Sequence, residues 1–135
     1  KIYTDYMNNE IITGPTELGK YFNVKRSSAF EILRSLEHKG YLKRIEHKGY
    51  MLTEVGILMA RKLIRNHRIL ETYFVVTLSI DVERACRFVR NLEFHVEDEF
   101  IDSLCRALGH PKCCPHGKPI PPGPKCCEKG DENEK

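Results

Sequence analysis

The sequence predicts a mainly α (α+β) protein, with an N-terminal winged helix-turn-helix followed by a helical domain. Two amphipathic helical patterns lie between Pro15 and Gly40, two short strand-like runs come next, and further helical patterns follow Thr53. A chain of 135 residues buries roughly two thirds of its unfolded surface, which suffices for one compact domain or two small units that share a helix.

The helix-turn-helix is predicted from local signals. Pro15 suits a first helical turn, and Asn23-Val24 is a tight connection. Ser27 or Ser28 is expected to cap the second helix, which Gly40 closes. The side chains expected to pack lie on one face of each helix: Leu18, Tyr21 and Phe22, then Phe30, Leu33 and Leu36 with Ile32 beside them.

A wing is predicted after these helices. Residues 41–46 and 50–52 are strand-like and are joined by His47-Lys48-Gly49, a hairpin with a basic tip. In a winged helix the second helix fits the major groove of DNA and the wing reaches phosphate or the minor groove. The residues expected to contact DNA are Thr16, Lys25, Arg26, Ser27, Ser28, Glu31, Arg34, Lys43, Arg44, His47 and Lys48.

The charge distribution agrees with this prediction. The net charge is +3, but residues 1–80 carry 13 Lys or Arg and 8 Asp or Glu, whereas residues 81–135 carry 9 and 11. The basic half is the part expected to bind a polyanion. The alternative is a winged helix adaptor that contacts another protein through the same polar residues.

Long apolar runs and a secretory signal are not found in the sequence, which favours a cytoplasmic protein without a membrane partner. Thiols stay reduced in that compartment, so the six cysteines favour metal binding or redox sensing over permanent disulfides, with thermophiles as the exception.

Two helices in the second half carry residues with the spacing of metal ligands. Thr53 is expected to cap a long connector helix that reaches about residue 78, on which His67 and Glu71 project from one face. Asp81 is expected to cap a helix with Cys86 and Glu93 beside an apolar stripe of Ala85, Phe88, Val89, Leu92 and Val96. Taken alone, each of these residues could have a purely structural role, since a buried Cys is commonly a small apolar side chain.

The chain resembles the diphtheria-toxin-repressor and manganese-transport-regulator family. The resemblance rests on R-N-H-R-I-L-E (residues 65–71), E-R-A-C-R-F (residues 83–88) and C-P-H-G-K-P-I-P (residues 114–121). It implies a dimeric, metal-dependent transcription regulator with a winged helix domain at 1–56 and a helical dimerisation and metal-binding domain at 57–121. The cysteine-containing tail at 122–135 is expected to be partly disordered, because residues 128–135 are charged and lack large apolar groups.

The resemblance also bears on two metal sites of the family. Glu93 matches a carboxylate ligand of the primary site, but Arg90 and Phe94 stand where iron-responsive members have Cys and His, and a guanidinium is a poor ligand. His67 and Glu71 match the ancillary site, and Cys86 stands where the family has His. A thiolate shifts the preference toward zinc and away from manganese.

We therefore expect one zinc ion, with Fe and Mn as the alternatives, bound by His67, Cys86 and Cys114, and by Glu71, Glu93 or His116 as fourth ligand. The doublets at 113–114 and 126–127 could also form a second Cys-rich site or a disulfide.

The expected function is a homodimeric regulator, metal-dependent or stabilised by zinc, that binds a near-palindromic operator on double-stranded DNA. The alternatives are the adaptor with a structural zinc, and a regulator that senses oxidation through Cys126 or Cys127. An enzyme is not expected, because the sequence has no H-E-x-x-H or comparable catalytic spacing.

Overall fold

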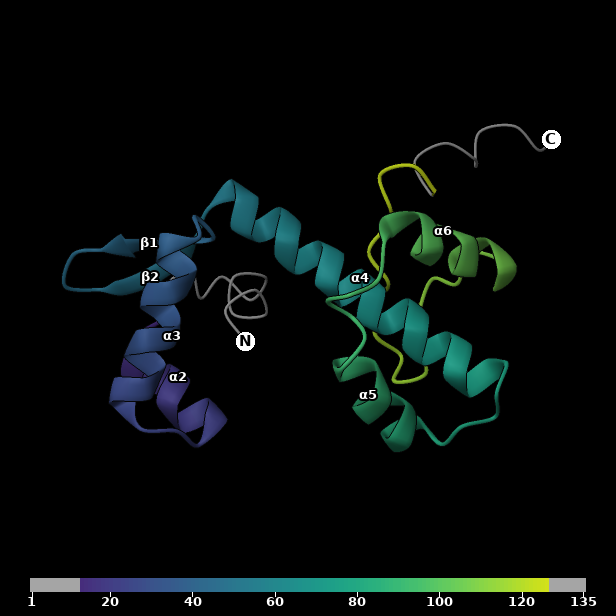
Figure 1. Cartoon of the computed structure of the whole chain (residues 1–135), viewed down its shortest axis with the longest axis horizontal. Helices are drawn as coiled ribbons and strands as arrows, with labels where there is room; N and C mark the ends of the chain where they lie inside the picture. The colour runs from purple at the N-terminus through teal and green to yellow at the C-terminus, as the bar shows by residue number, and fades with distance from the viewer. Residues whose placement is uncertain (1–12, 127–135) are drawn as a thin grey trace. The chain divides into compact units, whose positions relative to one another are not determined.

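The computed structural model describes residues 13–126 and confirms the predicted fold class. The chain forms two compact units, Lys1–Ala60 and Arg61–Lys135, and the boundary lies within helix α4 (Glu54–Val76) (Figure 1). The expected tail disorder at 128–135 lies outside the described residues.

The helix-turn-helix consists of α2 (Pro15–Phe22) and α3 (Arg26–His38). Pro15 occupies the first position of α2, and Asn23 ends it in the left-handed conformation with φ 52°. The predicted serine cap of α3 is wrong, because the capping position is Lys25 and the two serines lie inside the first turn. The Val24 N–H bonds to the Gly19 carbonyl at 2.9 Å and closes the end of α2, and the Ala29 N–H donates to the Lys25 carbonyl at 3.0 Å, so Lys25 accepts the first bond of α3.

The core of the first unit is formed by buried residues of both helices and the wing: Leu18, Ala29, Leu33, Leu42 and Tyr50. Of the predicted face of α3, only Leu33 is fully buried, while Phe30 and Leu36 are half-buried and Ile32 is exposed. Ala29 shares the buried row with Leu33 because it lies four positions earlier.

The wing pairs β1 (Leu42–Ile45) with β2 (Gly49–Leu52) in antiparallel register, so that Leu42 faces Leu52 and Ile45 faces Gly49. The turn at 46–48 has His47 at φ 58°. Gly49 belongs to the second strand and not to the predicted hairpin tip.

Helix α4 begins as predicted. The Thr53 hydroxyl accepts from the Gly56 N–H at 3.0 Å and donates to the Gly40 carbonyl at 2.6 Å, which ties the first turn of α4 to the end of α3. A Cβ at Gly56 would lie 2.0 Å from the Tyr41 carbonyl oxygen, so only glycine fits this contact.

In the second unit, α5 (Val82–Arg90) and α6 (Asp98–Ala107) pack with α4 around Ile69, Leu70, Val89, Ile101, Leu104 and Cys105. Asp81 caps α5 as predicted, since its carboxylate accepts from the N–H groups of Glu83 and Arg84.

The predicted stripe through Val96 is wrong because α5 ends at Arg90. Short-range turn bonds end the helix, such as Leu92 N–H to the Val89 carbonyl at 2.8 Å. The buried Asn66 amide then donates to the Glu93 carbonyl at 3.1 Å and holds the turn against α4. Ala85 and Val89 are buried and Val96 packs against the core as expected, whereas Phe88 and Leu92 are exposed.

After α6 the chain forms a tight hairpin and returns along the second unit. The Ile120 N–H donates to the Lys112 carbonyl at 2.8 Å, and the Cys114 N–H to the Lys118 carbonyl at 2.9 Å. Farther on, Gly123 packs directly against the buried Arg65 guanidinium. In the described part of the chain, no helix combines the length and the apolar character needed to cross a membrane.

Candidate metal centre and nucleic-acid interface

The first cluster of metal-ligating side chains joins α4 to α5. His67 and Glu71 lie one turn apart on α4, Cys86 comes from α5, and their ligand atoms all lie within 4.8 Å of one another. Cys86 Sγ is 3.6 Å from His67 Nε2. Two ligands of a tetrahedral zinc ion, with Zn–S of about 2.3 Å and Zn–N of about 2.0–2.1 Å, are themselves about 3.6 Å apart.

Glu93 contacts the opposite side of the His67 ring. Its Oε2 lies 2.6 Å from His67 Nδ1, which leaves Nε2 directed toward Cys86. The prediction that Glu93 lines up with Cys86 on one helix is wrong, since Glu93 lies in the turn after α5. In this position Glu93 can orient the histidine and fix its tautomer, as carboxylates do for metal-bound imidazoles.

A second cluster consists of Glu71, Cys114 and His116, whose ligand atoms also lie within 4.8 Å of one another. His116 Nδ1 is 2.5 Å from Glu71 Oε1. Glu71 is 1% exposed and Cys114 6%. Although His116 is close, Glu71 Oε1 has no hydrogen bond of acceptable geometry.

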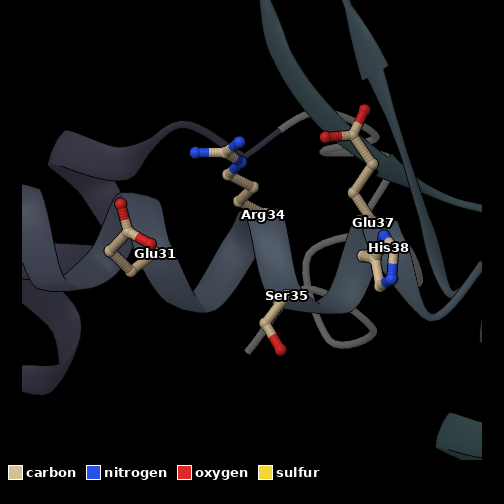
Figure 2. A pocket seen from close by; sticks show the side chains of 5 residues that line it. All are labelled: Glu31, Arg34, Ser35, Glu37 and His38. Carbon is tan, nitrogen blue, oxygen red and sulfur yellow. The ribbon is translucent and has the colours of Figure 1, made fainter.

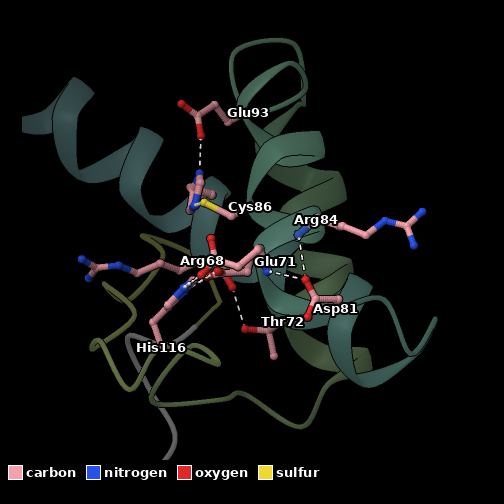
Figure 3. Close-up of polar contacts among 10 residues, drawn as sticks. Arg68, Glu71, Thr72, Asp81, Arg84, Cys86, Glu93 and His116 are labelled. Carbon is pink, nitrogen blue, oxygen red and sulfur yellow. Dashed lines mark hydrogen bonds and ion pairs between the residues drawn. The ribbon is translucent and has the colours of Figure 1, made fainter. Parts of the chain in front are cut away.

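Glu71 therefore belongs to both clusters, and Figure 3 shows it between Cys86 and His116. His67, Cys86 and Cys114 do not form such a group by themselves among the described residues. The buried carboxylate, which the resemblance matched to the ancillary site and which was one of three options for the fourth ligand, is the group that connects the helices to the hairpin.

These side chains line one open hollow of about 370 Å³. The remaining lining residues include three cations, Arg68, Arg90 and Lys118. Arg90, which the resemblance placed at a ligand position of the primary site, lies beside the clusters, whereas Phe94 is 66% exposed.

A third cluster was not predicted as a set. The ligand atoms of Cys105, His110 and Cys126 lie within 4.8 Å of one another. The sequence marked the doublet at 126–127 as a candidate ligand, but it gave no indication that Cys105 and His110 would join Cys126.

The residues predicted to contact DNA are all exposed. They lie at the start of α2, along α3 and on the wing: Thr16, Lys25, Arg26, Ser27, Ser28, Glu31, Arg34, Lys43, Arg44, His47 and Lys48. Figure 2 shows Arg34 and Glu37 projecting from one side of α3 and Ser35 from the other. The exposed face of α3 thus carries cationic, anionic and hydroxyl groups that can read base edges.

Comparisons with known proteins identify the family. The model of the iron dependent repressor, metal binding and dimerisation domain matches residues 53–122. An uncharacterized HTH-type transcriptional regulator of Methanocaldococcus jannaschii is 30% identical over 104 residues, which are 77% of this chain and 83% of that relative.

Solved structures with the same fold agree. A hypothetical protein from Sulfolobus solfataricus is 32% identical, with a TM-score of 0.74 over 89% of this chain and 92% of that one. The manganese regulator SloR is 28% identical, with a TM-score of 0.79 over 90% of this chain and 56% of SloR. ScaR with bound Zn²⁺ is 28% identical, with a TM-score of 0.74 over 90% and 57%. The resemblance noted in the sequence is therefore confirmed, and the chain belongs to the iron-dependent repressor family, whose members are transcription regulators and not enzymes.

Proposed function

We propose that the chain is a homodimeric, zinc-responsive regulator that binds a near-palindromic DNA operator in the cytoplasm. The observation that carries this proposal is the buried Glu71 carboxylate, shared by His67 and Cys86 on one side and by Cys114 and His116 on the other. Its Oε1 has no hydrogen bond of acceptable geometry and only the ion pair with His116, and a cation bound there would further compensate the buried charge.

Zinc is proposed because the donors are mixed and partly soft. Two thiols, two imidazoles and the Glu71 carboxylate make up the two clusters in the hollow, which the exposed Glu83 carboxylate also lines. Manganese prefers oxygen donors, whereas thiolate and imidazole suit zinc. His67, Glu71 and Cys86 are the proposed core, with Cys114 or His116 completing a tetrahedral set and Glu93 orienting His67.

The proposed DNA surface is the exposed face of α3 together with the wing. Arg34 on α3 and Arg44 and Lys48 on the wing are exposed cations. A recognition helix would read bases while the cations bind phosphate, which gives salt-dependent affinity.

The proposed dimer surface is apolar. Phe88, Leu92 and Phe94 follow one another along α5 and the turn after it, and Phe100 on α6 is exposed as well. A second copy of the chain would bury these rings, which in the monomer are in contact with water.

Helix α4 supplies the proposed coupling between metal and DNA. It starts at the hydrogen bond between Thr53 and Gly40 in the first unit and carries His67 and Glu71 in the second. Zinc would regulate DNA binding only if it prefers one of two arrangements of the dimer, and the size of that preference limits the response.

The test is an operator-binding titration. An operator fragment is selected from random double-stranded DNA with the zinc-loaded protein, and its affinity is then measured by fluorescence anisotropy across free zinc concentrations. We expect zinc to tighten binding at least about tenfold in the folded protein, since typical allosteric couplings are 5–150-fold. The Cys86→Ser/Cys114→Ser double variant should lose this response.

Cys113→Ser is the matched control, because Cys113 is exposed and belongs to none of the clusters among the described residues. If no sequence is enriched and binding to random DNA is weak even at low salt, the winged helix is an adaptor and the proposal is wrong. If zinc raises thermal stability but leaves operator affinity unchanged, zinc is structural and the regulatory part fails.

A further inference from the structure

The geometry points to a second, separate metal site, formed by Cys105, His110 and Cys126, which takes a soft divalent ion such as Zn²⁺. The ligand atoms of these three residues lie within 4.8 Å of one another. They share no member with the clusters around Glu71, so this site does not depend on the proposed function.

The end of α6 brings His110 over Cys105. The His110 N–H bonds to the Cys105 carbonyl at 2.9 Å, and the Gly109 N–H bonds to the Arg106 carbonyl at 3.0 Å. These paired bonds form the Schellman motif, which needs a left-handed residue after the helix, and Gly109 has φ 73°. His110 follows at φ 54°, so two successive left-handed residues fold its ring back toward the helix.

The returning tail brings Cys126 to the same place. Gly123 packs against Arg65, and Arg65 Nη2 lies 3.0 Å from Asp102 Oδ1 on α6. Cys126 Sγ in turn lies 3.7 Å from the Asp102 carbonyl oxygen. Because Asp102 and Cys105 are three residues apart on α6, they occupy one face, and Cys126 reaches the face that carries Cys105.

The distances fit a tetrahedral ion. His110 Nδ1 lies 3.6 Å from Cys105 Sγ and 3.6 Å from Cys126 Sγ. These separations equal the distance of about 3.6 Å between a sulfur and a nitrogen ligand on one zinc ion. His110 Nδ1 faces two sulfurs at once. As an acceptor it can take a hydrogen bond from only one thiol at a time, whereas a metal ion can bind this nitrogen and both sulfurs together.

The rival arrangement is a hydrogen-bonded pair of thiols, in which Cys105 donates to His110 and Cys126 donates to the Asp102 carbonyl. Thiol hydrogen bonds are weak, and they would leave the site insensitive to metal. A metal ion would displace the protons of both thiols. It would then link Cys126 in the tail to Cys105 on α6 through two metal–sulfur bonds. A water molecule can supply the fourth ligand.

The experiment counts metal ions per chain in the full-length protein, kept reduced with a phosphine and reconstituted with Co²⁺ as the probe. Native mass spectrometry gives the stoichiometry, and the sulfur-to-cobalt charge-transfer absorbance reports thiolate ligation. We expect Cys126→Ser and His110→Ala each to remove one ion per chain. The Cys86→Ser/Cys114→Ser variant should retain this ion even if the proposed site around Glu71 is absent.

Cys113→Ser again serves as the control and should leave the count unchanged. Cys105 is 2% exposed, so its replacement could disturb the core, and the test therefore rests on His110 and Cys126. Unchanged Co²⁺ stoichiometry and charge-transfer absorbance in both variants would overturn the inference. The inference would also be overturned if Cys105 and Cys126 form a disulfide and the reduced protein still binds no ion at this site.

Discussion

Replacement of the buried carboxylate by an amide, Glu71→Gln, should have opposite effects on stability with and without zinc. Glu71 is 1% exposed and its Oε1 has only the misaligned His116 Nδ1 at 2.5 Å. Without metal, the ion pair with His116 is the only compensation at Oε1, which has no hydrogen bond of acceptable geometry, and the amide removes the buried charge. With zinc, the same replacement removes a ligand.

The two effects differ in magnitude. A buried charge that lacks its partner costs about 3–5 kcal/mol, and His116 offsets part of this cost. The metal-free variant should therefore be more stable than the metal-free wild type by about 1–3 kcal/mol. At free zinc 1,000-fold above its Kd, the wild type gains about 4.1 kcal/mol. A 100-fold weaker variant loses about 2.8 kcal/mol of that gain.

Thermal unfolding in EDTA and in buffered zinc measures both effects. One kcal/mol shifts the Tm of a chain of this size by roughly 3–5 °C. Zinc should then raise the Tm of the wild type by roughly 12–20 °C and that of Glu71→Gln by roughly 4–7 °C.

Glu83→Gln is the matched control, since that carboxylate is 85% exposed and lies 3.8 Å from the same histidine. Equal zinc shifts in the wild type and Glu71→Gln, or a metal-free variant that is less stable than the wild type, would refute the reasoning.

Three further predictions concern other contacts. Glu93→Gln should weaken zinc binding about 10–100-fold without changing the number of ions bound, because it loosens His67; competition with a zinc-binding dye measures this, and an unchanged affinity contradicts it. Gly56→Ala should lower the free energy of unfolding by about 1–3 kcal/mol because its Cβ would lie 2.0 Å from the Tyr41 carbonyl oxygen. Helix propensity alone predicts a gain of about 1 kcal/mol, so the sign of the change measured by urea denaturation distinguishes the two. Lys48→Ala should weaken operator binding by a similar factor for all sequences and reduce the salt slope by about 1; a loss confined to the specific operator would show that Lys48 reads bases.

Local signals in the sequence were sufficient for most of the fold. Pro15 begins a helix through the φ angle that its ring fixes, and Thr53 and Asp81 do so through side-chain hydrogen bonds to the first helical turn, so all three roles could be predicted from the local sequence. Where tertiary contacts decide, the predictions were wrong. Helix α3 has Lys25 at its capping position, directly after the turn that the bond from Val24 to Gly19 closes, and α5 ends before the turn that Asn66 holds against α4.

Site residues that lie close together in the sequence could be predicted, whereas those joined only by tertiary contacts could not. His67 and Glu71 lie on one helix, and their four-residue spacing places them together whatever surrounds them. The importance of Glu71 depends on its burial, which a spacing pattern does not contain. The cluster of Cys105, His110 and Cys126 depends on a helix end and a returning tail, neither of which has a sequence period.

The contact at Gly123 limits how the sequence can vary. An added Cβ would lie 2.7 Å from the Arg65 guanidinium carbon, and Arg65 cannot retreat because it is buried and paired with Asp102. A side chain at this position would therefore strain the contact between the tail and Arg65, in the segment that leads to Cys126. In a saturation library at position 123, we therefore expect glycine to be strongly enriched when the selection requires the tail to stay attached to the second unit.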